Sequence, residues 1–253
     1  MNPRGLYAIY RFEMSRWRRT LGQSLVAPVI TTSLYFLVFG SAIGGRMSDM
    51  AGIDYGSFIV PGLILLAVLT QSIANASFGI YFPKFTGTIY EILSAPLSPL
   101  ETVTGYVGAA VTKSVILALV TLATATLFVD VRVEHPLLML IFLIAIAVGF
   151  CLFGFLIGLL ADNFEQLQFA PLLVVTPLAF LGGIFYAVDS LAEPWRTVTL
   201  FNPIVYLVSG YRWTFYGYAD VPLGASLAAM ALCILIPLAA VAWIFRTGKR
   251  LKQ

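Results

Sequence analysis

The chain has 253 residues, of which 60% are hydrophobic and 11% are charged, and its mean hydropathy is +0.92. Soluble domains carry about 25% charged residues, so this composition excludes a soluble globular protein and predicts an integral membrane protein with one transmembrane domain, 1–253. The net charge of +3 lies mainly at the two ends of the chain, which bears on membrane topology and not on nucleic-acid binding.

The first segment, 1–21, is basic and aromatic. Leu6, Ile9, Glu13 and Trp17 fall at helical spacing, and four arginines follow Tyr10. This pattern predicts an amphipathic helix that lies on the membrane surface, with a plain positively charged flank of the first span as the alternative. A signal peptide is not expected, because no long apolar stretch with a cleavage site follows the basic residues.

Six apolar segments come next, and each is long enough to cross a bilayer, which takes roughly 20 residues. Lysine and arginine gather at both ends of the chain and favour the cytoplasm, so six spans with both termini in the cytoplasm are expected. The fold class is therefore an all-α membrane protein. The predicted spans are Gln23–Ile43, Ser57–Phe78, Thr104–Phe128, Pro136–Leu160, Phe169–Ala187 and Leu223–Phe245.

Several polar residues lie inside the predicted spans, among them Gln71, Asn75 and Lys113. Gln71 and Asn75 are four residues apart and share a helix face, where they either hydrogen-bond to a neighbouring helix or line a conduit. Lys113 is close enough to the cytoplasmic end of its span for its ammonium group to reach the membrane surface. Packing inside the protein and contact with a substrate are the other two interpretations of Lys113.

The segment 81–104 joins the second and third spans and is expected in the cytoplasm. Thr88 and Glu91 match a capping box, and an apolar stripe begins at Ile89, so a two-turn amphipathic helix is predicted. This helix either lies on the membrane or inserts into a groove of a partner protein. Its apolar stripe consists of Ile89, Ile92 and Leu93.

The same segment is predicted to end with the start of the third span. Pro96 cannot continue the short helix, and Ser98 with Glu101 matches a second capping box. Pro99 stands at the first helical position, where its missing N–H costs nothing.

The segment 188–222 contains two further short helices by prediction. Ser190 and Glu193 match a capping box for the first, and Asn202 and Pro203 match the N-cap and first position of the second. Both helices are too short to cross a bilayer and rich in aromatic residues, which predicts re-entrant helices on the extracytoplasmic side.

Arg212 lies in the second of these outer helices, in an aromatic and partly buried setting. A lone charge there is costly unless it is paired or hydrated. We therefore expect Arg212 to pair with Asp189 or Glu193, or to face the aqueous end of a pathway.

The run Pro203–Ile204–Val205–Tyr206, then five residues, then Arg212, resembles the C-terminal signature of type-2 ABC exporter permeases. The preceding LGGIFY, Leu181–Tyr186, fits the same pattern, and the similarity covers nearly the whole chain. The resemblance implies the membrane subunit of a bacterial ABC exporter in the cytoplasmic (inner) membrane. It also implies a homodimer in which each copy pairs with a separate ATPase that binds ATP and magnesium.

The resemblance further assigns a role to the short cytoplasmic helix. In such permeases the loop between the second and third spans carries a coupling helix that contacts the ATPase. The coupling residues here would be Thr88, Ile89, Tyr90, Glu91, Ile92 and Leu93. The cargo, which in this family is a lipid, glycan, drug or peptide, is left open.

The chain contains no motif that would power transport. It has no GxxxxGK[ST] phosphate loop and no HExxH, GxSxG or CxxC pattern, so no catalytic, metal or cofactor site is expected in it. A secondary transporter and a membrane assembly factor remain the alternatives. An ATPase that copurifies with the chain would exclude the first, and substrate-stimulated ATP hydrolysis by the complex would exclude the second.

Overall fold

The structure is a computed structural model that describes residues 2–43, 49–50 and 52–247. These residues form helices and no strands apart from one isolated bridge between Met50 and Ile53. The basic tail beyond Thr247, on which part of the topology prediction rests, lies outside the described residues.

Five helical segments of the described chain are long and apolar enough to cross a membrane. The sixth predicted span appears as a shorter apolar helix, Phe164–Phe180, so the count of six spans stays a prediction. The five long segments are α2 (Leu21–Tyr35) with the first part of η1 (Phe36–Ile43), α3 (Tyr55–Phe58) with α4 (Val60–Thr86), α6 (Pro99–Ala125), α7 (Pro136–Leu160) and α12 (Leu223–Thr247).

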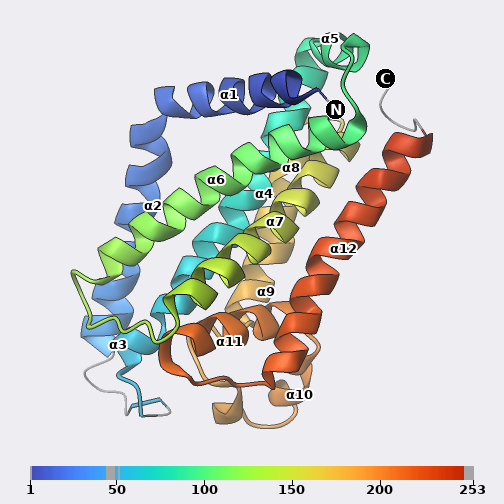
Figure 1. The fold of residues 1–253 in the computed structure, drawn as a ribbon. Coiled ribbons are helices and arrows are strands. Elements are labelled where there is room, and N and C mark those ends of the chain that lie inside the picture. Colours follow the sequence, from blue (N-terminus) through green and yellow to red (C-terminus); the bar gives the residue numbers. More distant parts are fainter. Residues whose placement is uncertain (1, 44–48, 51, 248–253) are drawn as a thin grey trace.

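The short helices gather at the two ends of the bundle (Figure 1). The helix α1 (Pro3–Arg19) and the helix α5 (Ile89–Ser94) lie at one end, next to the C-terminal end of α12. The opposite end carries α3, α10 (Trp195–Leu200) and α11 (Pro203–Tyr216). This arrangement agrees with the prediction that the first segment and the 81–104 segment share one side and the outer helices the other.

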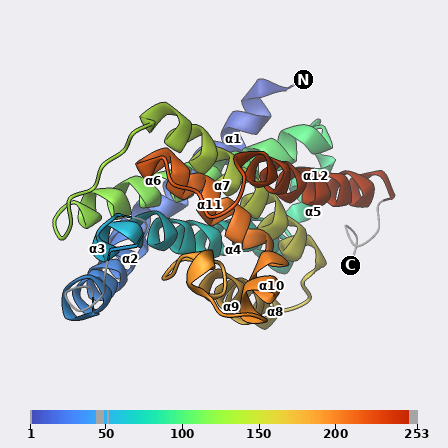
Figure 2. The same ribbon diagram turned by 90° about the horizontal axis from the view of Figure 1, so that it is seen from below.

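The helix α4 forms the centre of the bundle and packs most extensively on α7 and α6. Two glycines of α7, Gly154 and Gly158, allow the close approach: a Cβ built on Gly154 would lie 2.5 Å from the carbonyl oxygen of Ile73 in α4. Small residues four apart let membrane helices approach in this way. By contrast, α2 and α12 lie at opposite edges of the bundle and are mostly exposed (Figure 2).

The fifth predicted span has different limits in the structure. The prediction was Phe169–Ala187, but the helix begins with α8 (Phe164–Phe169), continues through η3 (Ala170–Val175) and ends with α9 (Thr176–Phe180). It begins early because the Asn163 side chain accepts a hydrogen bond from the N–H of Gln166 at 3.0 Å. It ends early because Gly183, with φ of +73°, turns the chain in a conformation that favours glycine.

The first outer helix was also predicted wrongly. Ser190 does not cap a helix: it ends the single turn η4 (Val188–Ser190), and its hydroxyl donates to the carbonyl of Ala187 at 2.7 Å. The chain then passes Pro194, and α10 begins only at Trp195.

The limits of the second and third spans also differ from the prediction. The helix α4 continues to Thr86 and α6 begins at Pro99, so the connection occupies 87–98 rather than 81–104. The capping box of Ser98 and Glu101 is confirmed, with Ser98 Oγ accepting from the Glu101 N–H at 3.3 Å and Glu101 Oε2 from the Ser98 N–H at 2.7 Å.

Candidate functional site

The helix α5 has one face fixed on the bundle and another face exposed. Ile89 is buried and Ile92 half-buried, in a cluster that includes Ile9 of α1 and Val103 of α6. Tyr90 is 51% exposed and Glu91 is exposed. Two of the three predicted stripe residues therefore pack against the chain itself, and the third, Leu93, has a side chain outside the described part.

The predicted capping box at the start of α5 is wrong. Thr88 already has helical backbone angles, and its side chain makes no cap hydrogen bond. Its hydroxyl lies 3.0 Å from that of Thr86, at the end of α4. The turn into α5 depends instead on Gly87, whose φ of +79° favours glycine.

The second outer helix, α11, begins as predicted. The Asn202 side chain accepts from the N–H of Ile204 at 3.0 Å and donates through Nδ2 to the carbonyl of Leu178 at 2.6 Å. Pro203 occupies the first helical position. Asn202 thus caps α11 and joins it to α9, while the hydroxyl of Tyr206 donates to the carbonyl of Leu200 in α10 at 2.9 Å.

Arg212 is completely buried, and its predicted partners are wrong. Its Nη1 lies 2.6 Å from Asp220 Oδ2, and its Nη2 donates to the carbonyl of Gly183 at 2.5 Å. The guanidinium also stands 3.8 Å above the ring of Phe58. Burial lowers the pKa of Arg212, and the carboxylate of Asp220 opposes this shift. Arg212 therefore holds the outer helices on the bundle.

The carboxylates predicted for Arg212 have other partners. Asp189 pairs with Arg196 at 2.6 Å on the surface, and Glu193 accepts from the hydroxyl of Thr197 at 2.8 Å. Asp220 could have been considered from the sequence, because it is the acidic residue nearest to Arg212 along the chain after that helix.

Two open pockets follow one another along the face of α4 that carries Gln71 and Asn75. Gln71 lines a pocket of about 300 Å³ between α2, α4 and the η3–α9 run, together with Thr31, Thr32 and Thr176. Asn75, one turn away, lines a second pocket of about 330 Å³ nearer to α1. Both side chains are half-buried, and among the described residues neither forms a hydrogen bond to another helix. The structure thus places each residue at its own open pocket beside α2, with a mixed polar and apolar lining.

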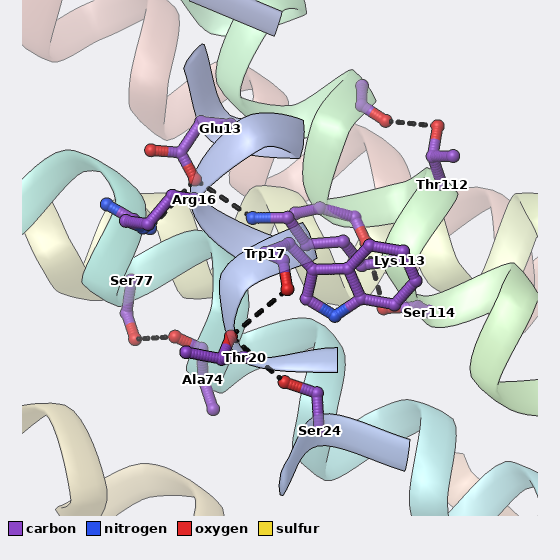
Figure 3. Close-up of polar contacts among 12 residues, drawn as sticks. Glu13, Arg16, Trp17, Thr20, Ser24, Ala74, Ser77, Thr112, Lys113 and Ser114 are labelled. Carbon is purple, nitrogen blue, oxygen red and sulfur yellow. Dashed lines mark hydrogen bonds and ion pairs between the residues drawn. The ribbon is translucent and has the colours of Figure 1, made fainter. Parts of the chain in front are cut away.

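A buried charge cluster joins α1 to α6 (Figure 3). Glu13 Oε2 lies 2.9 Å from Lys113 Nζ and 2.8 Å from Arg16 Nη2. Glu13 and Lys113 are almost fully buried, so Lys113 packs inside the protein and does not reach the membrane surface. The hydroxyl of Tyr10 adds a hydrogen bond to Thr112 at 3.1 Å. The sequence pattern puts Glu13 at helical spacing with Ile9 and Trp17, but it predicts no partner for this carboxylate.

Known proteins resemble this chain along most of its length. The family model described as ABC-2 type transporter matches residues 4–216. The chain is 38% identical over 230 residues to the inner membrane transport permease YadH of Escherichia coli K12, which covers 91% of this chain and 90% of that protein. It is also 23% identical over 242 residues to nodulation protein J of Neorhizobium galegae, covering 93% of this chain and 91% of that protein.

These matches agree with the resemblance seen in the outer-helix signature. The several long apolar helices make the chain a multi-pass membrane protein, and the Escherichia coli relative places it in the inner membrane. A permease of this kind transports and does not catalyse a reaction. The chain belongs to the ABC-2 type transporter family and is the membrane permease subunit of an ABC transporter.

Proposed function

We propose that this chain is the membrane subunit of an ABC exporter, that it acts as a homodimer, and that a separate ATPase binds ATP and magnesium and drives it. Both termini and α5 then face the cytoplasm, and α10 and α11 face the extracytoplasmic side. The membership in a permease family and the lack of a phosphate loop in the sequence support a division of labour between two chains.

The observation that carries the proposal is how α5 packs against the bundle. Ile89 and Ile92 fix one face of α5 in a cluster with residues of α1, α4, α6 and α7, while Tyr90 and Glu91 are exposed. A partner that displaces the exposed face therefore displaces a packed unit and not a loose loop. This is the mechanical property that a coupling helix needs, because packed cores transmit displacement.

The open pocket beside Gln71 of α4 supports the homodimer. Gln71, Thr70 and Thr176 line an open pocket, although polar groups facing lipid are costly. The helices that flank this pocket also expose large apolar side chains, such as Ile30 of α2 at 55% and Leu172 of η3 at 62%. In the proposal, a second copy packs on these side chains, and the Gln71 pockets of the two copies are enclosed together as one pathway. Membrane lipids surround the remaining apolar surface.

The experiment compares Glu91→Ala with Glu193→Ala, which removes the same charge from an exposed site at the opposite end. Truncating a hot-spot residue of an interface costs about 2 kcal/mol or more, which corresponds to roughly thirtyfold weaker binding. We expect Glu91→Ala to insert and fold normally, yet to capture less ATPase or to uncouple ATP hydrolysis from export. Glu193→Ala should retain both activities.

Complex recovery and transport-linked ATP hydrolysis are measured for both variants beside the parent chain. The coupling role of α5 is rejected if Glu91→Ala and the matching Tyr90→Ala both bind the ATPase and transport like the parent. The homodimer is tested separately, by the mass of the purified complex and by cysteine cross-linking between copies at Ile30. A complex with one permease copy would contradict the enclosed pathway.

A further inference from the structure

The pocket of about 330 Å³ beside Asn75 differs from the pocket beside Gln71 in its charge. Figure 3 shows its two cationic lining residues, Arg16 and Lys113, beside Glu13. The pocket lies where α1 meets α2, and its walls also include α4, α6 and α8. Two cations, Arg16 and Lys113, line it, together with the polar side chains of Thr20, Asn75 and Gln168. Its volume falls within the range of about 300–1,000 Å³ that is usual for ligand sites.

The two cations share a single carboxylate. Glu13 Oε2 contacts both Arg16 and Lys113, and Glu13 itself does not line the pocket. One negative and two positive side chains leave one positive charge in the cluster. Arg16 Nη1 also has no hydrogen-bond partner among the described residues.

The Arg16 side chain of this cluster is 27% exposed and lines the pocket, so the remaining positive charge is accessible to an anion there. One wall of the pocket is aromatic: the ring of Phe78 lies 5.0 Å from the Arg16 guanidinium. A charge in such surroundings costs free energy unless an opposite charge or water compensates it. Arginine and lysine, with asparagine and glutamine amides beside them, are donors suited to phosphate oxygens.

We propose that this pocket binds an anionic phosphate headgroup, with Arg16 and Lys113 as the charged contacts and Asn75 and Gln168 as further hydrogen-bond donors. The site goes beyond the proposed transport function, because binding requires neither the ATPase nor ATP. The phosphate belongs either to a lipid of the leaflet next to α1 or to a soluble phosphate, and the experiment separates these two sources.

The test uses the full chain in lipid nanodiscs and then in detergent, where native mass spectrometry counts retained phosphatidylglycerol and phosphatidylcholine. Arg16→Gln removes one pocket charge and keeps the Glu13–Lys113 pair, so the fold should persist. Lys113→Gln removes the other charge. Arg11→Gln is the matched control, because Arg11 lies on the same helix, is exposed and does not line the pocket.

The parent chain and Arg11→Gln should retain phosphatidylglycerol in preference to phosphatidylcholine. Arg16→Gln should retain about tenfold less phosphatidylglycerol, as expected for the loss of one charge-assisted contact. Asn75→Val tests the site without any change of charge and should also lower retention. If inorganic phosphate displaces the bound lipid, the site takes soluble phosphate. If the lipid is retained when inorganic phosphate is added, the site takes the lipid headgroup. Equal retention by the parent, Arg16→Gln and Arg11→Gln overturns the proposal.

Discussion

The buried ion pair between Arg212 and Asp220 gives the sharpest test of how the outer helices are held. Asp220 uses both carboxylate oxygens: Oδ2 contacts Arg212, whereas Oδ1 accepts from the N–H of Val188 at 2.9 Å and from the hydroxyl of Tyr218 at 3.2 Å. In Asp220→Asn the amide oxygen can keep the contacts of Oδ1. The change therefore removes the charge that compensates Arg212 and replaces the Oδ2 acceptor with an amide donor that faces Arg212 Nη1.

The size of the effect follows from burial. The side chains of Arg212 and Asp220 are 0% and 2% exposed, so removing one partner leaves a buried charge and costs about 3–5 kcal/mol. The surface pair of Arg196 and Asp189 has the same 2.6 Å separation, but its side chains are 47% and 65% exposed. Pairs of that kind contribute only about 0–1 kcal/mol. Asp189→Asn is therefore a control with equal chemistry and different burial.

The assay heats each purified variant in detergent and measures the fraction that stays folded and monodisperse. A destabilisation of about 1 kcal/mol lowers the midpoint by roughly 2–4 °C in a chain of this size, so Asp220→Asn should lose about 6–20 °C. Asp189→Asn should lose less than about 4 °C. If the two variants lose the same amount, burial does not determine the strength of the Arg212 pair and the reasoning fails.

Two further predictions concern packing and topology. Gly154→Ala should destabilise the fold by about 1–3 kcal/mol and lower the heating midpoint by roughly 2–12 °C, because its Cβ would meet the Ile73 carbonyl. A Cβ at Gly108 in α6 meets no atom within 4 Å, so Gly108→Ala should change the midpoint little. Equal midpoints for the two glycine variants would contradict close packing of α7 on α4. A reporter fused after Gln253 should be active only as a cytoplasmic reporter, and one inserted near Glu193 only as an extracytoplasmic one; an extracytoplasmic C-terminus would contradict the six-span topology.

The features that short sequence patterns specify were predicted well. The capping box of Ser98 and Glu101 and the Asn202–Pro203 start of α11 both appear in the structure. The fourth predicted span coincides with α7, Pro136–Leu160, because polar or turn residues bound its apolar run on both sides. At the starts of α6 and α11, residues within one helical turn supply the capping hydrogen bonds, so the neighbours along the chain are sufficient.

The two predicted capping boxes that the structure lacks, at Thr88 and Ser190, show that other contacts can compete with a capping hydrogen bond. Thr88 and Ser190 carry the correct residue types, yet their hydroxyls lie against Thr86 and the Ala187 carbonyl instead. A side chain with two acceptable partners adopts the one that the surrounding backbone presents, and the sequence motif does not contain that backbone.

The sequence by itself determined that the chain is helical and crosses a membrane, because long apolar runs can satisfy their backbone only within a helix. It also determined the family, through the signature from Pro203 to Arg212 and its similarity along the chain. Only the tertiary structure decided the partners of the buried charges. Lys113 meets Glu13 across 100 positions, and Arg212 meets Asp220 rather than Asp189 or Glu193. Such pairs depend on how helices cross in space, since burial strengthens a charge contact that is worth little in water.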